Sequence, residues 1–417
     1  MGSEMCIRDS INYYMKPSES PTFCPLLWLG ASHWQGGVFS PCCQFDPDDK
    51  NNNKEEQSFW RDGIEERPYK IERKMLAKGL KPSKCRHCWM QEDAGVRSLR
   101  TEALDFDWWK PYVDVIDQTT GDDGSFKHQP VYFDLRLGTK CNLACRMCSP
   151  TSSSLIEKEI DDNLSEFQKF GFQMQDYAYA KKFVTTEQHI DQVFDYIQTI
   201  DKPFRLKFTG GEPFLNARIP DFIDNLIDSG KAKNIDILFI TNLTTVKRSL
   251  LEKIQKNFKR FSLSVSMEGV GDAYEYIRYP STWEKFQRNA KMLDDLKIEY
   301  GICYTGNSLT IGNFIDWLDW VVEHDIDWDF NPVLGPPHYN ISCLPADFKQ
   351  KIIKDIKEWR DNHSDYPFLH RLEGAINWLN RSQILESWEA LKNDTKIKDS
   401  IRKQSIHKSI PKLAAYF

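Results

Sequence analysis

The chain has 417 residues, of which 40% are hydrophobic and 28% charged, and its formal net charge is −6 at pH 7. That length suffices for a full hydrophobic core and for more than one domain, and the composition is typical of soluble globular proteins. A slightly acidic chain gives no electrostatic argument for binding nucleic acid or an anionic membrane. No apolar run approaches the roughly 20 residues of a membrane-spanning helix, so we expect no membrane segment.

The start of the chain lacks the apolar core of a secretory signal, and we interpret residues 1–19 as a disordered or non-native leader. The chain holds eleven cysteines. Without an export signal they indicate a reducing compartment, where thiols bind metals or do chemistry more often than they form disulfides. We therefore expect a cytoplasmic protein.

Composition divides the rest of the chain into segments. Residues 20–117 carry one set of cysteines and little periodicity, and residues 118–129 have the polar, glycine-rich composition of a linker. Strands alternate with helices over residues 130–340, and residues 341–417 are predicted to form a helical extension. The basic residues of 396–417 are interpreted as a solvated tail or helix, with contact to a partner as the alternative.

Six apolar or alternating segments are typical of strands, and amphipathic segments follow each of them. The predicted strands are Val131–Leu137, Phe204–Phe208, Ile235–Ile240, Arg260–Ser266, Ile298–Tyr304 and Trp328–Leu334. The predicted helices are Ser152–Phe170, Glu187–Ile200, Ile219–Ser229, Val246–Asn257, Trp283–Leu296, Ile311–Glu323, Asp347–Asn362, Leu369–Asn380 and Gln383–Asn393. Strands separated by helices imply parallel pairing. We expect an α/β fold, a partial (β/α)6 barrel similar to a TIM barrel, with its chemistry at the carboxyl ends of the strands.

Cys141, Cys145 and Cys148 form a C-x3-C-x2-C motif directly after the first predicted strand. Thiolates at such short spacing bind one face of an iron–sulfur cluster. Three ligands on a four-iron cube leave one iron open to activate a substrate. The alternative is a structural zinc site completed by a distant fourth ligand, although zinc modules usually use paired C-x2-C motifs.

Gly210-Gly211-Glu212-Pro213 follows the second predicted strand. Two glycines permit a close backbone approach that a Cβ would block, and Glu212 could accept from an ammonium group. A simple strand-to-helix turn is the alternative.

The cysteine motif after a first strand, with Gly-Gly-Glu-Pro after the next, resembles the radical S-adenosylmethionine superfamily over about residues 131–334. The resemblance implies that Cys141, Cys145 and Cys148 hold a 4Fe–4S cluster whose open iron binds S-adenosylmethionine. It further implies reductive cleavage of S-adenosylmethionine to a 5′-deoxyadenosyl radical, which abstracts hydrogen from a substrate. Relatives usually have an aromatic residue where this chain has Met147.

The resemblance also assigns cofactor-binding roles at the strand ends. It gives the Gly-Gly-Glu-Pro turn to the methionine amino group, and the end of the fourth strand to the ribose and carboxylate. Glu268 stands where relatives have an aspartate, and Arg278 is either near the carboxylate or a surface arginine. Asn242 either faces the pocket or caps a helix. The predicted cofactor-binding residues are Met147, Gly210, Gly211, Glu212, Pro213, Asn242, Ser264, Ser266, Glu268 and Arg278.

A second set of cysteines precedes the barrel, and four thiolates suit a closed 4Fe–4S cluster or zinc equally well. This region resembles the twitch domain, the short relative of the SPASM domain, although that module usually follows the barrel. The resemblance favours an auxiliary 4Fe–4S cluster, with zinc or unliganded cysteines as alternatives. Cys43 could replace Cys42, and His87 is a further possible ligand. The predicted ligands are Cys24, Cys42, Cys85 and Cys88.

Three functions stay open. The first is radical chemistry on a peptide or protein, and the second is the same chemistry on a small metabolite, nucleotide or sugar. A wide groove would favour the peptide and a closed pocket the metabolite. The third is a non-catalytic iron–sulfur or zinc protein. For either enzyme, the resemblance implies an electron donor such as flavodoxin or ferredoxin.

Overall fold

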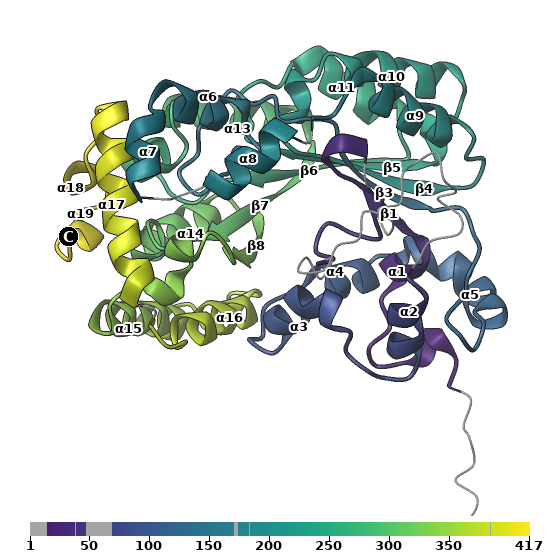
Figure 1. The fold of residues 1–417 in the computed structure, drawn as a ribbon, viewed down its shortest axis with the longest axis horizontal. Helices are drawn as coiled ribbons and strands as arrows, with labels where there is room; N and C mark the ends of the chain where they lie inside the picture. Colours follow the sequence, from purple (N-terminus) through teal and green to yellow (C-terminus); the bar gives the residue numbers. More distant parts are fainter. Residues whose placement is uncertain (1–14, 38, 47–68, 171–173, 183, 384) are drawn as a thin grey trace, which may run out of the picture.

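The computed structural model describes residues 15–37, 39–46, 69–170, 174–182, 184–383 and 385–417 (Figure 1). Most of the predicted leader, residues 1–14, lies outside the described residues. The last residues of the predicted leader are ordered, because Pro17–Glu19 forms a 3-10 helix. The Ser18 backbone N–H donates to Asp117 at 2.9 Å, so this stretch is part of the fold.

One sheet of eight strands organises the molecule, in the order β2-β1-β3-β4-β5-β6-β7-β8. Strands β3 to β8 are parallel neighbours in chain order, joined by helices. The expected α/β partial barrel of six units is therefore confirmed. The strand bounds are β1 Gly30–His33, β2 Phe39–Ser40, β3 Tyr132–Arg136, β4 Phe204–Thr209, β5 Ile235–Thr241, β6 Arg260–Ser266, β7 Glu299–Gly306 and β8 Asp327–Pro332.

Strands β1 and β2 were not expected from the sequence. All four residues of β1 are buried, so the strand lacks the alternation that marks a half-exposed strand. β1 pairs in parallel with β3, and β2 pairs antiparallel with β1. The sheet thus contains strands from both sides of the predicted linker at residues 118–129. The role of this linker as a domain boundary stays a prediction.

The helices follow the predicted pattern with changes at their ends. The segment predicted as one helix over 152–170 is two, which Asn163 separates. None of the described helices is long and apolar enough to cross a bilayer. The helix bounds are α1 Pro25–Leu29, α2 Lys70–Ala77, α3 Arg86–Glu92, α4 Leu99–Asp105, α5 Val113–Thr119, α6 Ser154–Asp162, α7 Leu164–Phe170, α8 Met174–Lys182, α9 Glu187–Gln198, α10 Arg218–Asp228, α11 Arg248–Asn257, α12 Gly271–Ile277, α13 Trp283–Leu296, α14 Phe314–Glu323, α15 Ala346–Asn362, α16 Leu369–Leu379, α17 Leu385–Arg402, α18 Ile406–Ser409 and α19 Pro411–Ala414.

Helices α9, α10 and α11 cover one face of the sheet, and the N-terminal helices α1 to α5 lie on its other side (Figure 1). The N-terminal segment, which is the described part of residues 15–129, begins at the β1 edge and reaches the opposite edge of the sheet. There the Gln91 side chain donates to Asn331 of β8 at 3.0 Å, and Arg97 pairs with Asp329 at 3.1 Å. The segment therefore spans the open side of the incomplete barrel.

Residues 396–417 are solvated only in part, since Lys396, Lys403, Lys408 and Lys412 are exposed as expected but two other basic residues are not. Helix α17 extends to Arg402, and the side chains of Lys398 and Arg402 are both fully buried. Lys398 pairs with Asp394, and Arg402 pairs with Glu159 of α6. The expectation of a solvated face at residues 396–417 is wrong at these positions, because the basic side chains meet buried acids that only the folded chain brings to them.

Candidate active site

The three-cysteine loop lies between β3 and α6 and is held by backbone hydrogen bonds. The Ala144 and Arg146 N–H groups donate to the carbonyls of Tyr279 and Ile277, at 2.7 and 2.9 Å. The Ser153 hydroxyl caps α6 and donates to the Leu143 carbonyl at 2.6 Å. The loop is therefore shaped by the segment that follows β6, far away in the sequence.

The three thiols are near enough to influence one another. Burial, then the neighbouring Cys145 and Cys141, raises the pKa of Cys148 to about 12. Burial and Cys145 raise the pKa of Cys141 to about 11. Thiols buried together without a cation favour the protonated form, and iron bound to them would reverse that preference.

The Gly-Gly-Glu-Pro turn touches the cysteine loop directly. Gly210 and Gly211 have φ of +77° and +56°, and a Cβ on Gly211 would lie 2.3 Å from the Lys140 carbonyl oxygen. The Glu212 N–H donates to that same carbonyl at 2.8 Å. Pro213 is buried and begins a 3-10 helix over Pro213–Leu215. The glycines thus allow the turn to pack against the residue before Cys141.

Glu212 is buried and joins β4 to β5. Its carboxylate accepts from the Thr241 hydroxyl at 2.9 Å, from the Asn242 N–H at 2.8 Å and from the Phe214 N–H at 3.2 Å. Burial raises the pKa of Glu212 to about 7, against these three donors. A carboxylate offers about four acceptor positions, so one remains for a further donor.

Asn242 lies at the cysteine loop. Its amide nitrogen donates to Asn142 at 3.1 Å and lies 3.8 Å from the Cys141 sulfur. Its carbonyl oxygen accepts from the Thr244 N–H at 2.9 Å. Asn242 therefore faces the cysteine loop and does not cap the following helix, because α11 begins at Arg248 with Lys247 as its N-cap.

Glu268 and Arg278 form a buried ion pair beside Cys145. The Arg278 Nε donates to Glu268 at 2.7 Å, and Nη1 lies 3.7 Å from the Cys145 sulfur. Arg278 is 7% exposed, which excludes the surface arginine that the sequence left open. An arginine against a thiolate stabilises the charged ligand.

The remaining predicted cofactor residues are less central. Ser264 lines a cavity inside the barrel, Ser266 ends β6 half-buried, and Met147 packs at the edge of the main core. Their binding roles stay predictions.

The N-terminal cysteines gather in one place. Cys24 precedes α1, Cys42 follows β2, and Cys85 and Cys88 lie at the start of α3. All four line one small cavity, together with Leu26, Trp89 and Arg100. Burial and the other cysteines raise the pKa of Cys42 well above its usual value.

Cys43 points elsewhere, although it is adjacent in sequence to Cys42. It lines the barrel cavity, which the other four N-terminal cysteines do not. His87 contacts the Gln44 carbonyl at 3.3 Å and does not line the cysteine cavity. The structure thus brings Cys24, Cys42, Cys85 and Cys88 together and separates Cys43 and His87 from them.

Among the described residues, no three cysteine, histidine or acidic side chains are placed to share one metal ion. A four-iron cube binds each thiolate through a different iron, so the sulfurs around it lie farther apart than those around one zinc ion.

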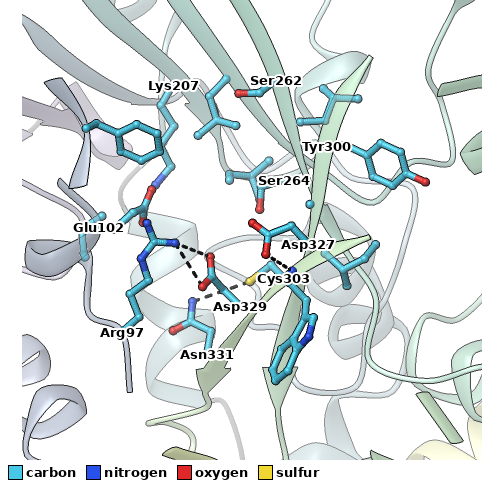
Figure 2. A pocket seen from close by; sticks show the side chains of 18 of the residues that line it. Arg97, Glu102, Lys207, Ser262, Ser264, Tyr300, Cys303, Asp327, Asp329 and Asn331 are labelled. Atoms are coloured by element: carbon cyan, nitrogen blue, oxygen red, sulfur yellow. Dashed lines mark hydrogen bonds and ion pairs between the residues drawn. The ribbon is translucent and has the colours of Figure 1, made fainter. Parts of the chain in front are cut away.

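A cavity of about 320 Å³ lies between the inner face of the barrel and the N-terminal segment. Figure 2 shows Arg97 directed at Asp329, and Asn331 directed at Cys303, inside it. Cys303 of β7 therefore lines the cavity. Sequence reasoning also missed Arg205 and Lys207, although alternating charges in an apolar strand are the signal that points to them.

Comparison with known proteins places this geometry in a class. A family model described as the Radical SAM superfamily matches residues 135–321, which include the three-cysteine loop and strands β4 to β7. That part of the chain is a radical SAM domain.

An uncharacterized protein of Methanocaldococcus jannaschii is 25% identical over 171 residues, which are 40% of this chain and 50% of that protein. The chain thus spans about half the length of this curated relative.

Two solved structures are similar at low identity. One, described as native anSMEcpe with bound AdoMet, is 17% identical with a TM-score of 0.38, covering 56% of this chain and 61% of that one. The other is Streptococcus suis SuiB bound to S-adenosylmethionine, 14% identical with a TM-score of 0.34, covering 56% and 45%.

Proposed function

We propose that this chain cleaves S-adenosylmethionine at a cluster bound by Cys141, Cys145 and Cys148, and that the resulting radical abstracts hydrogen from a substrate in the barrel cavity. The observation that carries the proposal is the convergence on the three-cysteine loop. Gly211 and Asn242 follow the ends of β4 and β5, Arg278 follows helix α12, and each contacts this loop. When bound, the cluster and S-adenosylmethionine supply the 5′-deoxyadenosyl radical.

The chain's own residues have positioning roles in this proposal. Arg278 stabilises the Cys145 thiolate, and Glu268 holds Arg278 in place. Asn242 does the same for Cys141, while Glu212 fixes the end of β5 that carries Asn242. The remaining acceptor position of Glu212 supports a contact with the methionine ammonium group.

A second cluster is part of the proposal, held by Cys24, Cys42, Cys85 and Cys88. Its support is the cavity that these four thiols share, because four thiolates are the ligand set of a closed 4Fe–4S cluster. Gln44 lines both this cavity and the barrel cavity, so only a thin wall separates them. A cluster held by these four cysteines would supply or accept one electron beside the barrel cavity.

Peptide or protein is the first candidate for the substrate, and the small metabolite is the second. A cavity of about 320 Å³ is at the lower end of the range for ligand pockets. It admits one side chain of a peptide or one small molecule, and this volume is the observation that favours the second candidate.

The first experiment counts iron and product in protein purified and reconstituted without oxygen. We expect about eight irons per chain and formation of 5′-deoxyadenosine with dithionite and S-adenosylmethionine. Cys141→Ala should reduce the count to about four and abolish the product. Cys343→Ser, a buried cysteine outside both sites, is the matched control and should change neither. A folded protein with no iron and no product would contradict the proposal.

The second cluster is tested by Cys42→Ala and Cys43→Ala. Cys42→Ala should lower the iron count to about four, while Cys43→Ala should leave it at about eight. Equal iron loss in both variants, or stoichiometric zinc in place of iron, would overturn the four-cysteine assignment.

Adding size-fractionated cell extract to the reconstituted protein separates the two substrate candidates, because a small molecule and a protein would stimulate 5′-deoxyadenosine formation from different fractions.

A further inference from the structure

Strand β4 places two cationic side chains on the inner face of the barrel. Phe204, Leu206 and Phe208 are buried on the face towards the helices, as Phe208 against Phe222 of α10 shows. Arg205 and Lys207 alternate with them and line the cavity of about 320 Å³. Burying a cation is costly unless another group compensates it.

The other cations around this cavity have acidic partners. Lys207 lies 3.2 Å from Asp134, Arg97 lies 3.1 Å from Asp329, and Arg260 donates through Nε to Glu299 at 3.1 Å. Their charges are therefore balanced within the protein.

Arg205 differs from them. It is 7% exposed, and among the described residues no acid lies within ion-pair distance of its guanidinium, while its buried Nε has no hydrogen-bond partner. Phe106 of the N-terminal segment stacks on it at 4.0 Å. Asp236, the residue opposite it on β5, is engaged by Lys259 at 3.3 Å. Glu102 also lines the cavity, but among the described residues it forms no ion pair with Arg205.

A guanidinium does not lose its proton in proteins, so burial alone cannot neutralise Arg205. Its planar fork of donors matches the two oxygens of a carboxylate or a phosphate. The aromatic ring on one face limits its movement and leaves its edge for an in-plane ligand. A bound anion would supply the missing counter-charge.

We propose that Arg205 is an anion subsite of the barrel cavity, and that the substrate binds there through a carboxylate or phosphate group. The inference deepens the proposed function and rests on it for the word substrate. Ser264 and Cys303 line the same cavity nearer to the carboxyl ends of the strands. The anchored group would thus lie at the amino end of the strands, with the rest of the molecule extending towards the three-cysteine loop.

Anion binding can be measured without turnover. The anaerobically reconstituted protein is dialysed to equilibrium against labelled inorganic phosphate and, in parallel, labelled acetate, with chloride keeping the ionic strength constant. We expect one anion per chain, and an affinity at least tenfold weaker in Arg205→Met. Binding of phosphate alone would identify a phosphorylated substrate, and binding of acetate alone would identify a carboxylate.

Arg381→Met is the matched control, because Arg381 also stacks on an aromatic ring, Trp378 at 3.9 Å, but lies outside this cavity. It should bind the anion like the wild type. Arg205→Lys, which keeps the charge without the fork, should bind with intermediate affinity and covers the case that Arg205→Met does not fold. No binding by the wild type, or equal binding by all three variants, would overturn the subsite. Absence of 5′-deoxyadenosine in a protein that binds the anion would instead reject the proposed function.

Discussion

Single residues at the site act through close backbone contacts, and Gly211 shows this most directly. Its φ of +56° and the 2.3 Å approach to the Lys140 carbonyl are two separate constraints. Gly230 shares the first, with φ of +72°, but an added Cβ there would meet nothing within 4 Å. Comparing substitutions at Gly211 and Gly230 therefore separates the cost of backbone strain from the cost of steric collision.

We expect Gly230→Ala to cost about 1–2 kcal/mol of unfolding free energy, which is the strain of a left-handed residue. Gly211→Ala should cost more and should also lower iron content, because the turn must move away from the residue before Cys141. Urea unfolding and iron analysis of both variants measure this. Equal losses in the two variants would show that the contact with Lys140 has no role of its own.

At the scale of elements, helix α17 packs against the three-cysteine loop and bonds to it. Lys398 donates to the Arg146 carbonyl within the loop at 3.1 Å and lies 3.1 Å from the buried Asp394. The Arg146 side chain is fully buried, stacks on Tyr276 at 3.6 Å and pairs with Asp399 of the same helix. The loop is thus fastened to the C-terminal segment as well as to the barrel.

Lys398→Met should destabilise the protein by about 3–5 kcal/mol, because it leaves the Asp394 carboxylate buried without its cation. Lys408→Met is the matched control, since Lys408 is 80% exposed and 4.0 Å from Asp272; it should change stability by at most about 0.5 kcal/mol. Thermal unfolding and iron retention report both effects. A Lys398→Met protein as stable as the control would show that α17 does not support the loop.

His33 of strand β1 makes a pH-dependent contribution to the free energy of unfolding. Burial lowers the pKa of His33 to about 4, whereas an unfolded histidine titrates near 6.5. The lower folded value means that protons bind the unfolded chain more tightly. Stability from this group is therefore complete above about pH 6.5 and is lost as the pH falls towards 4.

Between pH 7 and pH 5 the loss amounts to about 2 kcal/mol. His33→Asn should remove it, while His324→Asn, at an exposed position, should keep it. Hydrogen exchange of peptides that cover β1, compared at the two pH values, is the measurement. The same pH response in wild type and His33→Asn would rule out this source.

At the scale of the whole molecule, the N-terminal segment is built into the barrel. β1 covers the edge of β3, and Gln91 and Arg97 reach β8 on the far side (Figure 1). Removing the segment would expose an unpaired strand and the cavity at the same time.

Residues 130–417 expressed alone should therefore aggregate, and co-expression of residues 1–129 should restore soluble protein. Size-exclusion chromatography of the two preparations tests this. A monomeric, cooperatively unfolding 130–417 fragment would show that the predicted boundary at 118–129 separates independent domains.

The sequence by itself determined the repeating part of this protein. Strand and helix periodicity is local, so β3 to β8 and their helices follow from it, and the short spacing of Cys141, Cys145 and Cys148 predicts the loop that we propose as the cluster site. The tertiary structure alone decided which distant groups meet. It put Arg278 against Cys145, directed Cys42 and Cys43 into different cavities, buried Lys398 and left Arg205 facing the cavity. Those outcomes depend on contacts between residues far apart in the chain, and no local pattern encodes them.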